Sequence, residues 1–181
     1  MMFNVACINT CTTVEGPGRR LAIWFQGCNK KCDGCCNPQF IPLVPKHLLT
    51  LSEINQIIYK SKEVNDIEGI TYLGGEPTLQ KGLPQLSRAA ADIGLGVILF
   101  TGNPINELDP TYLENVDLVI DGPFIEKQRD RERNLVGSVN QKIICLTDRY
   151  ENCLDWFLEK RIEKVEVNID DGLAVFSGDV V

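Results

Sequence analysis

The sequence has few basic residues, no long apolar run and no secretory signal. Lysine and arginine total 18 against 25 aspartates and glutamates, which gives a formal net charge of −7 at pH 7. Such a chain has no excess of positive charge to neutralise phosphates, so nucleic acid is not an expected partner. No apolar run approaches the roughly eighteen residues of a membrane span, and residues 1–4 lack the basic and apolar regions of a signal peptide. We therefore expect a cytoplasmic protein without a membrane partner.

Repeats, low-complexity tracts and Gly/Ser linkers are also missing from the 181 residues, so we expect a single domain over residues 1–181. Short apolar runs alternate with amphipathic stretches, which is typical of an α/β domain. Strands are predicted at 21–25, 69–73, 97–100, 118–120 and 142–146, with two short β runs at 164–168 and 173–176. Helices are predicted from the N-cap Ser52 onward, within 80–93 with a start after Pro84, and at 150–161. A parallel sheet wrapped by helices is the expected architecture.

Polar breaks follow the predicted strands, at the edge where α/β folds bind ligands. The charged segment 126–133 mixes both signs and is expected to be a solvated loop or helix.

Cysteine is the exception in an otherwise ordinary composition. Eight cysteines are present, and four of them, Cys28, Cys32, Cys35 and Cys36, fall within residues 28–36. Without a signal peptide thiols are expected to stay reduced, so clustered cysteines indicate metal or redox chemistry. Cys145 and Cys153 are predicted to be small buried hydrophobic residues. For Cys7 and Cys11, a buried and a redox role both remain open.

The spacing CxxxCxxC of Cys28, Cys32 and Cys35 directly follows the predicted strand 21–25. Three close thiolates suit a soft metal centre, whereas structural zinc takes four ligands, usually as two separated pairs. There is no second pair, the single histidine is distant in sequence, and Cys36 as a fourth ligand needs difficult geometry. Three thiolates around a [4Fe–4S] cluster leave one iron open for a substrate or cofactor. Zinc and an incidental thiol patch remain the alternatives.

Four stretches carry a family resemblance. Residues 15–38, with the three cysteines, resemble the front of a radical S-adenosylmethionine (SAM) enzyme, and residues 72–77, with Gly-Gly-Glu-Pro at 74–77, resemble the GGEP motif of that superfamily. More narrowly, the chain resembles the small activating enzymes of glycyl radical enzymes. Residues 119–124 and 137–143 resemble the back half of anaerobic ribonucleotide reductase activating proteins. The resemblance spans residues 12–145.

The resemblance implies a fold, a cofactor set and residue roles. The fold is a partial, open (β/α)6-type barrel. Cys28, Cys32 and Cys35 bind three irons of a [4Fe–4S] cluster, and SAM chelates the fourth iron. The remaining implied SAM contacts are Gly74, Gly75, Glu76, Pro77, Thr101 and Asn37. Independently, two glycines after a strand allow close approach of a ligand, and a carboxylate suits an ammonium group.

The implied reaction is reductive cleavage of SAM to methionine and a 5′-deoxyadenosyl radical. This radical generates a glycyl radical on a partner, expected to be anaerobic ribonucleoside-triphosphate reductase, with a reducing protein such as flavodoxin or ferredoxin as electron donor. Two alternatives remain: another small radical SAM enzyme, which activates a different partner or modifies a peptide or small molecule, and a non-catalytic iron–sulfur or zinc module.

The sequence departs from the pattern at Gly34, Cys36 and Asn103. Many radical SAM enzymes have an aromatic residue before the third cysteine to lie against adenine, so this packing must come from elsewhere, with Phe40 or backbone atoms as candidates. Asp121 either faces the site or belongs to a turn. Residues 137–141 are predicted to dock a partner peptide through Asn140 and Gln141; the alternative is a turn before a strand.

Overall fold

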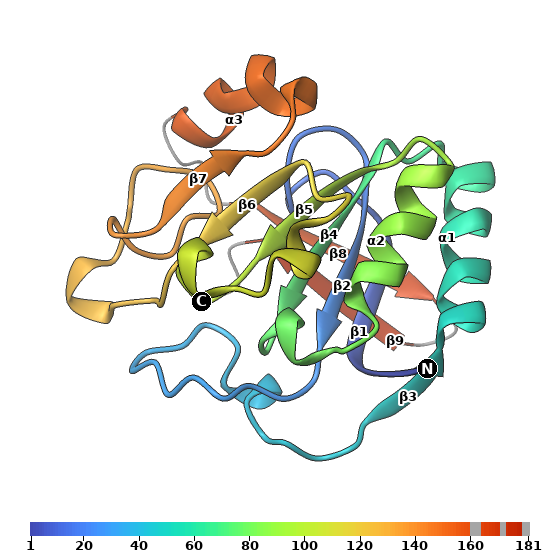
Figure 1. Cartoon of the computed structure of the whole chain (residues 1–181), viewed down its shortest axis with the longest axis horizontal. Helices are drawn as coiled ribbons and strands as arrows, with labels where there is room; N and C mark the ends of the chain where they lie inside the picture. Colours follow the sequence, from blue (N-terminus) through green and yellow to red (C-terminus); the bar gives the residue numbers. More distant parts are fainter. Residues whose placement is uncertain (160–163, 171–172, 179–181) are drawn as a thin grey trace.

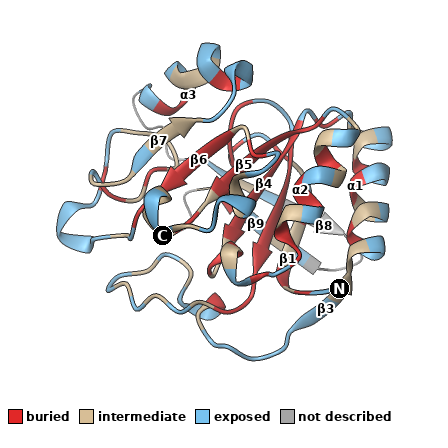
Figure 2. Ribbon diagram, in the orientation of Figure 1, coloured by how far each residue is buried: buried red, intermediate tan, exposed pale blue. Residues whose placement is uncertain are grey.

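The central element is a seven-stranded sheet with the order β3-β1-β2-β4-β5-β6-β7 (Figure 1). The computed structural model describes residues 1–159, 164–170 and 173–178. The strands of this sheet are β1 (Met2–Thr12), β2 (Arg20–Phe25), β3 (His47–Thr50), β4 (Gly69–Gly74), β5 (Gly96–Phe100), β6 (Leu118–Asp121) and β7 (Lys142–Cys145). Buried residues are concentrated in its central strands (Figure 2).

The sheet is mixed, so the expectation of a parallel sheet is wrong at its edges. Strands β2, β4, β5 and β6 are parallel neighbours. Strands β1, β3 and β7 pair antiparallel to their neighbours. The connection 13–19 between β1 and β2 is too short for the crossover that parallel neighbours need. The four parallel strands match the predicted strands closely, and the fold class α/β is confirmed.

Strands β1 and β3 were not predicted from the sequence. Strand β1 carries Asn4, Asn9 and two cysteines instead of a run of β-branched residues. Strand β3 has four residues, none of them buried, and is held by pairing with β1 at the edge of the sheet. Neither segment has the apolar run that marks the central strands.

Two helices cover one face of the sheet. Helix α1 (Leu51–Asn65) and helix α2 (Leu83–Asp92) pack Ile54, Ile58 and Leu86 against Ile23, Tyr72 and Leu99. The prediction of Ser52 as the N-cap is wrong, because the N-cap is Thr50, two residues earlier, which forms a reciprocal capping box with Glu53. Helix α2 lies within the predicted 80–93, but it begins at Leu83 and has Pro84 in its first turn, so the predicted start after Pro84 is wrong.

We call the opposite face of the sheet the inner face; its apolar residues include Ala22, Trp24, Leu73, Ile98 and Ile120. A 3-10 helix (Asp148–Cys153) and the short helix α3 (Leu154–Leu158) cover its β6 side, so the predicted helix 150–161 is divided. Residues 160 and 161 lie outside the described part of the chain. No helix of the described residues is both long enough and apolar enough to span a membrane.

A two-stranded hairpin of β8 (Val165–Asp170) and β9 (Leu173–Gly178) crosses behind the large sheet in Figure 1. It is bonded to β1, where Asn9 Nδ2 donates to Ser177 Oγ at 2.7 Å and Thr12 Oγ1 donates to Glu166 Oε2 at 2.6 Å. The predicted β runs at 164–168 and 173–176 are confirmed as strands.

Arg20 connects the amino ends of the parallel strands. Its side chain is fully buried, and all five of its N–H groups donate hydrogen bonds. The acceptors are the hydroxyls of Thr71 and Tyr150 and the carbonyls of Pro17, Ile70 and Gly96. One buried cation therefore ties β2, β4, β5, the 13–19 connection and the 148–153 helix together.

Replacing Arg20 with methionine should lower the free energy of unfolding by about 3 kcal/mol, because it leaves several buried acceptors without donors. Urea denaturation measures this. The matched control is Arg19→Met, whose ion pair with Asp66 is 48% and 88% exposed on its two side chains; it should cost less than about 0.5 kcal/mol. Similar losses in the two variants would contradict the structural role of Arg20.

Candidate functional site

The candidate site lies where β2, β4, β5 and β6 end. Residues 27–37, which we call the cluster loop, follow β2. Residues 74–77, 101–103 and 121–127 follow the other three strands. Because the carboxyl ends of parallel strands meet at one edge of a sheet, the fold brings the three cysteines and the GGEP motif together.

A close backbone approach fixes the start of the cluster loop. The Glu76 N–H donates to the Gly27 carbonyl at 2.9 Å, and the Gly75 N–H donates to the Phe25 carbonyl at 2.8 Å. A Cβ on Gly75 would lie 2.2 Å from the Gly27 oxygen, and one on Gly74, whose φ is +104°, would lie 2.4 Å from the Phe25 nitrogen. Only glycine fits at 74 and 75. Close backbone packing therefore requires glycine at 74 and 75, in addition to the ligand contact that the sequence predicts.

The Glu76 carboxylate is buried and accepts four hydrogen bonds. Oε1 accepts from the Thr78 N–H at 3.1 Å, the Thr78 hydroxyl at 2.7 Å and the Thr101 hydroxyl at 2.9 Å. Oε2 accepts from the Gly102 N–H at 2.8 Å. A carboxylate oxygen has two lone pairs, so Oε2 keeps capacity for a further donor such as an ammonium group.

The bonds to Glu76 also explain Thr101 and Asn103. Thr101 is joined directly to Glu76, and Asn103 Nδ2 donates to the hydroxyls of Thr78 and Thr101, each at 3.1 Å. Asn103 therefore links the segments that follow β4 and β5 by hydrogen bonds. Neither Thr78 nor Gly102 was predicted as a site residue. The only sequence signal was the position of Thr78 two residues after Glu76, where its N–H and hydroxyl can donate to the Glu76 carboxylate.

The three predicted iron ligands are half-buried on the cluster loop. Burial raises the pKa of Cys28, and the negative charges of Glu76, Cys32 and Cys35 raise it further. A hydrogen bond from Cys36 lowers the pKa of Cys35 to about 6. The Cys28 thiol therefore interacts electrostatically with the other two thiols and with the Glu76 carboxylate.

The donor set fits a [4Fe–4S] cluster. Within the described residues, no three His, Cys, Asp or Glu side chains are already grouped to hold a single metal ion. A [4Fe–4S] cluster takes one thiolate per iron, so its ligands need not converge on one point as zinc ligands do. Metal binding deprotonates the thiols.

The other cysteines are placed differently. Cys36 is exposed; the hydrogen bond to Cys35 raises the pKa of Cys36, and Asn37 Nδ2 lies 3.4 Å from its sulfur. Cys7 packs on the inner face beside Trp24, and burial raises its pKa to about 11. Cys11, Cys145 and Cys153 are half-buried and pack against apolar clusters, in line with the prediction for the last two.

The segment 126–133 is not wholly solvated, which corrects the expectation from its mixed charges. Asp130 is buried, and its carboxylate forms an ion pair of 2.5 Å with the half-buried Arg133. Arg133 also donates to the carbonyls of Ser138, Val139 and Gln141. These bonds join the segment to residues 137–141.

Residues 137–141 form a turn. Gln141 Oε1 accepts from the N–H groups of Gly137 and Ser138, while its Nε2 donates to the Gly122 carbonyl at 2.9 Å. Asn140 Nδ2 donates to the Pro123 carbonyl at 2.8 Å. The structure therefore favours the turn over the peptide-docking interpretation of Asn140 and Gln141. Asp121 ends β6 and is buried, and its carboxylate accepts from the Ile105 N–H at 2.8 Å, at the start of the 3-10 helix Ile105–Glu107.

Comparison with known proteins shows the family of the chain. The family described as a 4Fe-4S single cluster domain matches residues 14–144. The chain belongs to this family. Its relatives include the anaerobic ribonucleoside-triphosphate reductase-activating protein of Vibrio cholerae, which is 31% identical over 72% of this chain and 90% of its own length. The protein of the same name from Escherichia coli K12 is 28% identical with the same coverage.

The family resemblance found in the sequence is thus confirmed. Among solved structures, QueE from Escherichia coli aligns with a TM-score of 0.47 and 15% identity over 57% of this chain and 53% of its own.

Anaerobic reconstitution should load about four irons and four sulfides per chain. Single alanine replacements at Cys28, Cys32 and Cys35 should each remove most of this content, because each thiolate holds a different iron. Cys36→Ser is the matched control at the neighbouring position and should keep nearly the full content. Iron and sulfide assays measure this content in each variant. Full clusters in all three alanine variants, or equal loss in Cys36→Ser and Cys35→Ala, would contradict the ligand assignment.

Proposed function

We propose that this protein is a radical SAM activating enzyme that generates a glycyl radical on a partner enzyme. The observation that carries the proposal is the direct backbone contact between Gly27 and Glu76, which sets the three-thiol loop beside the GGEP segment. In this arrangement one ligand can bind the open position of the metal centre and place its ammonium group at the Glu76 carboxylate. The names of the relatives support the activity class and the partner, anaerobic ribonucleoside-triphosphate reductase.

The chain's own residues bind and orient the two cofactors. Cys28, Cys32 and Cys35 hold the [4Fe–4S] cluster, and Oε2 of Glu76 accepts from the methionine amine of SAM. Gly74, Gly75 and Pro77 shape the backbone around this group, with Thr101 fixing the carboxylate and Asn37 continuing the cluster loop. When bound, the cluster and SAM supply one-electron cleavage and hydrogen abstraction; the protein supplies orientation and exclusion of water.

Lys30 contributes positive charge next to the Glu76 carboxylate and the cluster loop. A Cβ on Gly102 would meet Lys30 Cγ at 3.1 Å and Glu76 Oε2 at 3.4 Å, so the Lys30 stem covers the end of β5 beside the carboxylate. Its ammonium partly offsets the negative charge of a thiolate-bound cluster. Lys31 is exposed and adds charge at the rim.

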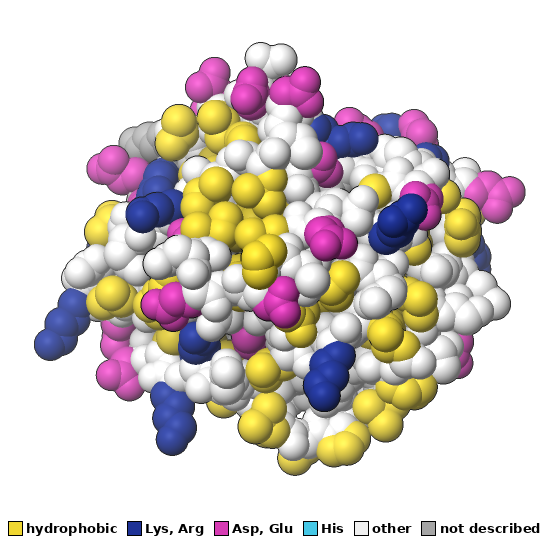
Figure 3. All heavy atoms as spheres, in the orientation of Figure 1, with side chains coloured by type: hydrophobic (Ala, Val, Ile, Leu, Met, Phe, Trp, Pro, Cys, Tyr) yellow, Lys and Arg dark blue, Asp and Glu magenta, His cyan; other side chains and the backbone are white. Residues whose placement is uncertain are grey.

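The proposed fold is a single domain that forms a shortened, open version of the (β/α)6 barrel, with β2, β4, β5 and β6 as its parallel strands. Exposed apolar side chains next to the cluster loop are suited to contact with a protein partner. Leu43 is 70% exposed and Val44 is 54% exposed, and Leu43 lies against Gly27. Figure 3 shows apolar side chains along the lower edge, where Figure 1 places this segment. A reducing protein such as flavodoxin or ferredoxin would supply the electron.

Reconstituted protein given dithionite and SAM should release methionine and 5′-deoxyadenosine in equal amounts, slowly and without a partner. Chromatography measures both products. Cys36→Ser should retain this activity, and Cys32→Ala should lose it with the cluster. Intact SAM after strong reduction of a loaded protein would contradict the proposal and favour a non-catalytic iron–sulfur module. With the reductase present, electron paramagnetic resonance should detect a glycyl radical on the partner.

A further inference from the structure

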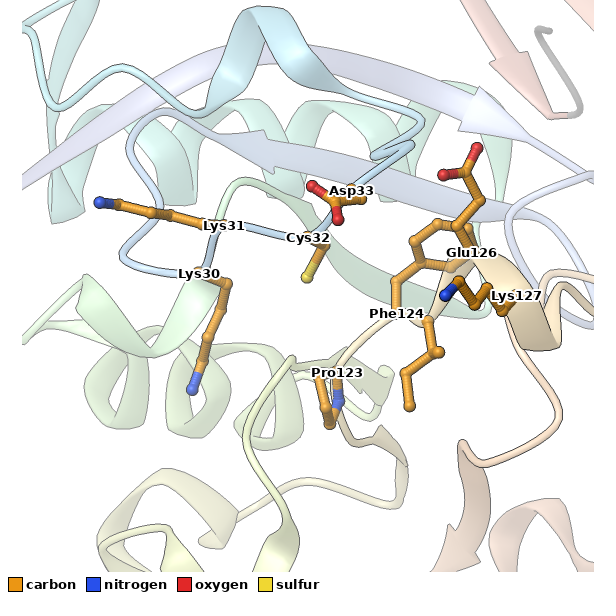
Figure 4. Close-up of a pocket in the computed structure, with 9 residues that line it drawn as sticks. Lys30, Lys31, Cys32, Asp33, Pro123, Phe124, Glu126 and Lys127 are labelled. Carbon is orange, nitrogen blue, oxygen red and sulfur yellow. The ribbon is translucent and has the colours of Figure 1, made fainter.

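A cleft of about 400 Å³ lies between the cluster loop and the segment after β6 (Figure 4). Residues 30–33 form one wall and residues 123–127 form the other. In Figure 4 the sulfur of Cys32 points toward the space between the walls. The cleft therefore opens directly beside one of the predicted iron ligands.

Lys30 links the cleft to the Glu76 end of the site. It lines the cleft, and its stem lies against Gly102, next to Glu76 Oε2. The strands end in the sheet order β4, β5, β6, so Glu76, Gly102 and Pro123 follow one another along this edge. A ligand with an ammonium group at Glu76 can extend along the same edge into the cleft.

The cluster loop itself offers no aromatic surface. Residues 28–37 contain no aromatic residue, and Gly34, with a φ of +69°, holds the position before Cys35. A Cβ on Gly34 would lie 2.6 Å from the Glu126 carboxyl group. The positive φ at Gly34 therefore disfavours an aromatic side chain at this position, and the Glu126 side chain would have to move to admit one.

Phe124 is the aromatic residue among those that line the cleft. The alternative considered from the sequence, Phe40, is buried on the inner face with Trp24 and Leu73, and the Lys46 ammonium lies 5.4 Å from its ring centre. Phe40 is not one of the residues lining the cleft. Phe124 is half-buried, so part of its ring remains accessible.

Residues 137–141 hold Phe124 in place. A Cβ on Gly137 would lie 2.9 Å from Phe124 Cδ2, so the ring packs directly on the backbone there. The Arg129 guanidinium lies 5.6 Å from the ring centre. The carbonyl of Pro123 accepts from Asn140, and the N–H of Ile125 donates to Ser138 Oγ at 3.1 Å. The wall carrying Phe124 is thus fixed on both sides of the ring.

We propose that this cleft binds the adenine ring of SAM, with Phe124 as the stacking surface and residues 137–141 as its support. The inference rests on the proposed function, since it assigns the base-binding part of the same site. It gives residues 137–141 a positioning role, through Phe124, in place of partner docking.

Phe124→Leu should weaken SAM binding about tenfold, as loss of base–aromatic stacking does elsewhere, and leave the binding of free methionine unchanged. Anaerobic titration calorimetry of the reconstituted protein with SAM and with methionine measures both. Phe124→Tyr should restore SAM binding. Tyr59→Leu, at an aromatic residue 55% exposed on α1, is the matched control and should bind SAM as the unmodified protein does.

Gly137→Ala provides a second variant if Phe124→Leu loses its cluster, because the added methyl group displaces the ring; it should weaken SAM binding and spare methionine. SAM binding by Phe124→Leu equal to that of Tyr59→Leu would overturn the assignment while leaving the proposed function intact. Equal loss of SAM and methionine binding would also overturn it, since Phe124 would then be a structural residue. No SAM binding by the unmodified protein would overturn both.

Discussion

The contact between Gly27 and the Gly75-Glu76 backbone is the constraint on which the site depends. It sets the loop after β2 against the loop after β4 at a distance that excludes any side chain at Gly75. Three cysteines and one carboxylate, separated by about forty residues of sequence, lie on adjacent loops at one edge of the sheet as a result. The parallel register of β2 and β4, which pairs Phe25 with Gly74, brings the two strand ends level and makes the contact possible.

Two buried charges stabilise the opposite ends of the parallel strands. Arg20 donates all five N–H groups at the amino ends, and Glu76 accepts four hydrogen bonds at the carboxyl ends. Burial of an ionised group is costly unless hydrogen bonds compensate it. Arg20 uses its whole donor capacity within the protein, which makes it structural. Glu76 retains acceptor capacity on Oε2, which makes it available to a ligand.

The central strands and the core of the site could be predicted from sequence because their signals are local. The apolar runs at 21–25, 69–73 and 97–100, the CxxxCxxC spacing and the Gly-Gly-Glu-Pro turn each occupy one short stretch. Strands β1 and β3 could not be predicted, because they are held by pairing with other strands and have no apolar run of their own. The roles of Asn140 and Gln141 were also hidden, since the carbonyls of Pro123 and Gly122 to which they donate become their neighbours only in the fold. Phe124 lies in the stretch 119–124 that carries the family resemblance, but no role was predicted for it.

The central claim is that the cluster loop and Glu76 form one site for one ligand. Electron–nuclear double resonance of the reduced, reconstituted protein with SAM labelled at the methionine nitrogen tests it most directly. The account predicts a coupling between the labelled nitrogen and the electron spin of the cluster, because a SAM amine held by Glu76 would bind next to the three-cysteine loop. Bound SAM without such a coupling would contradict it.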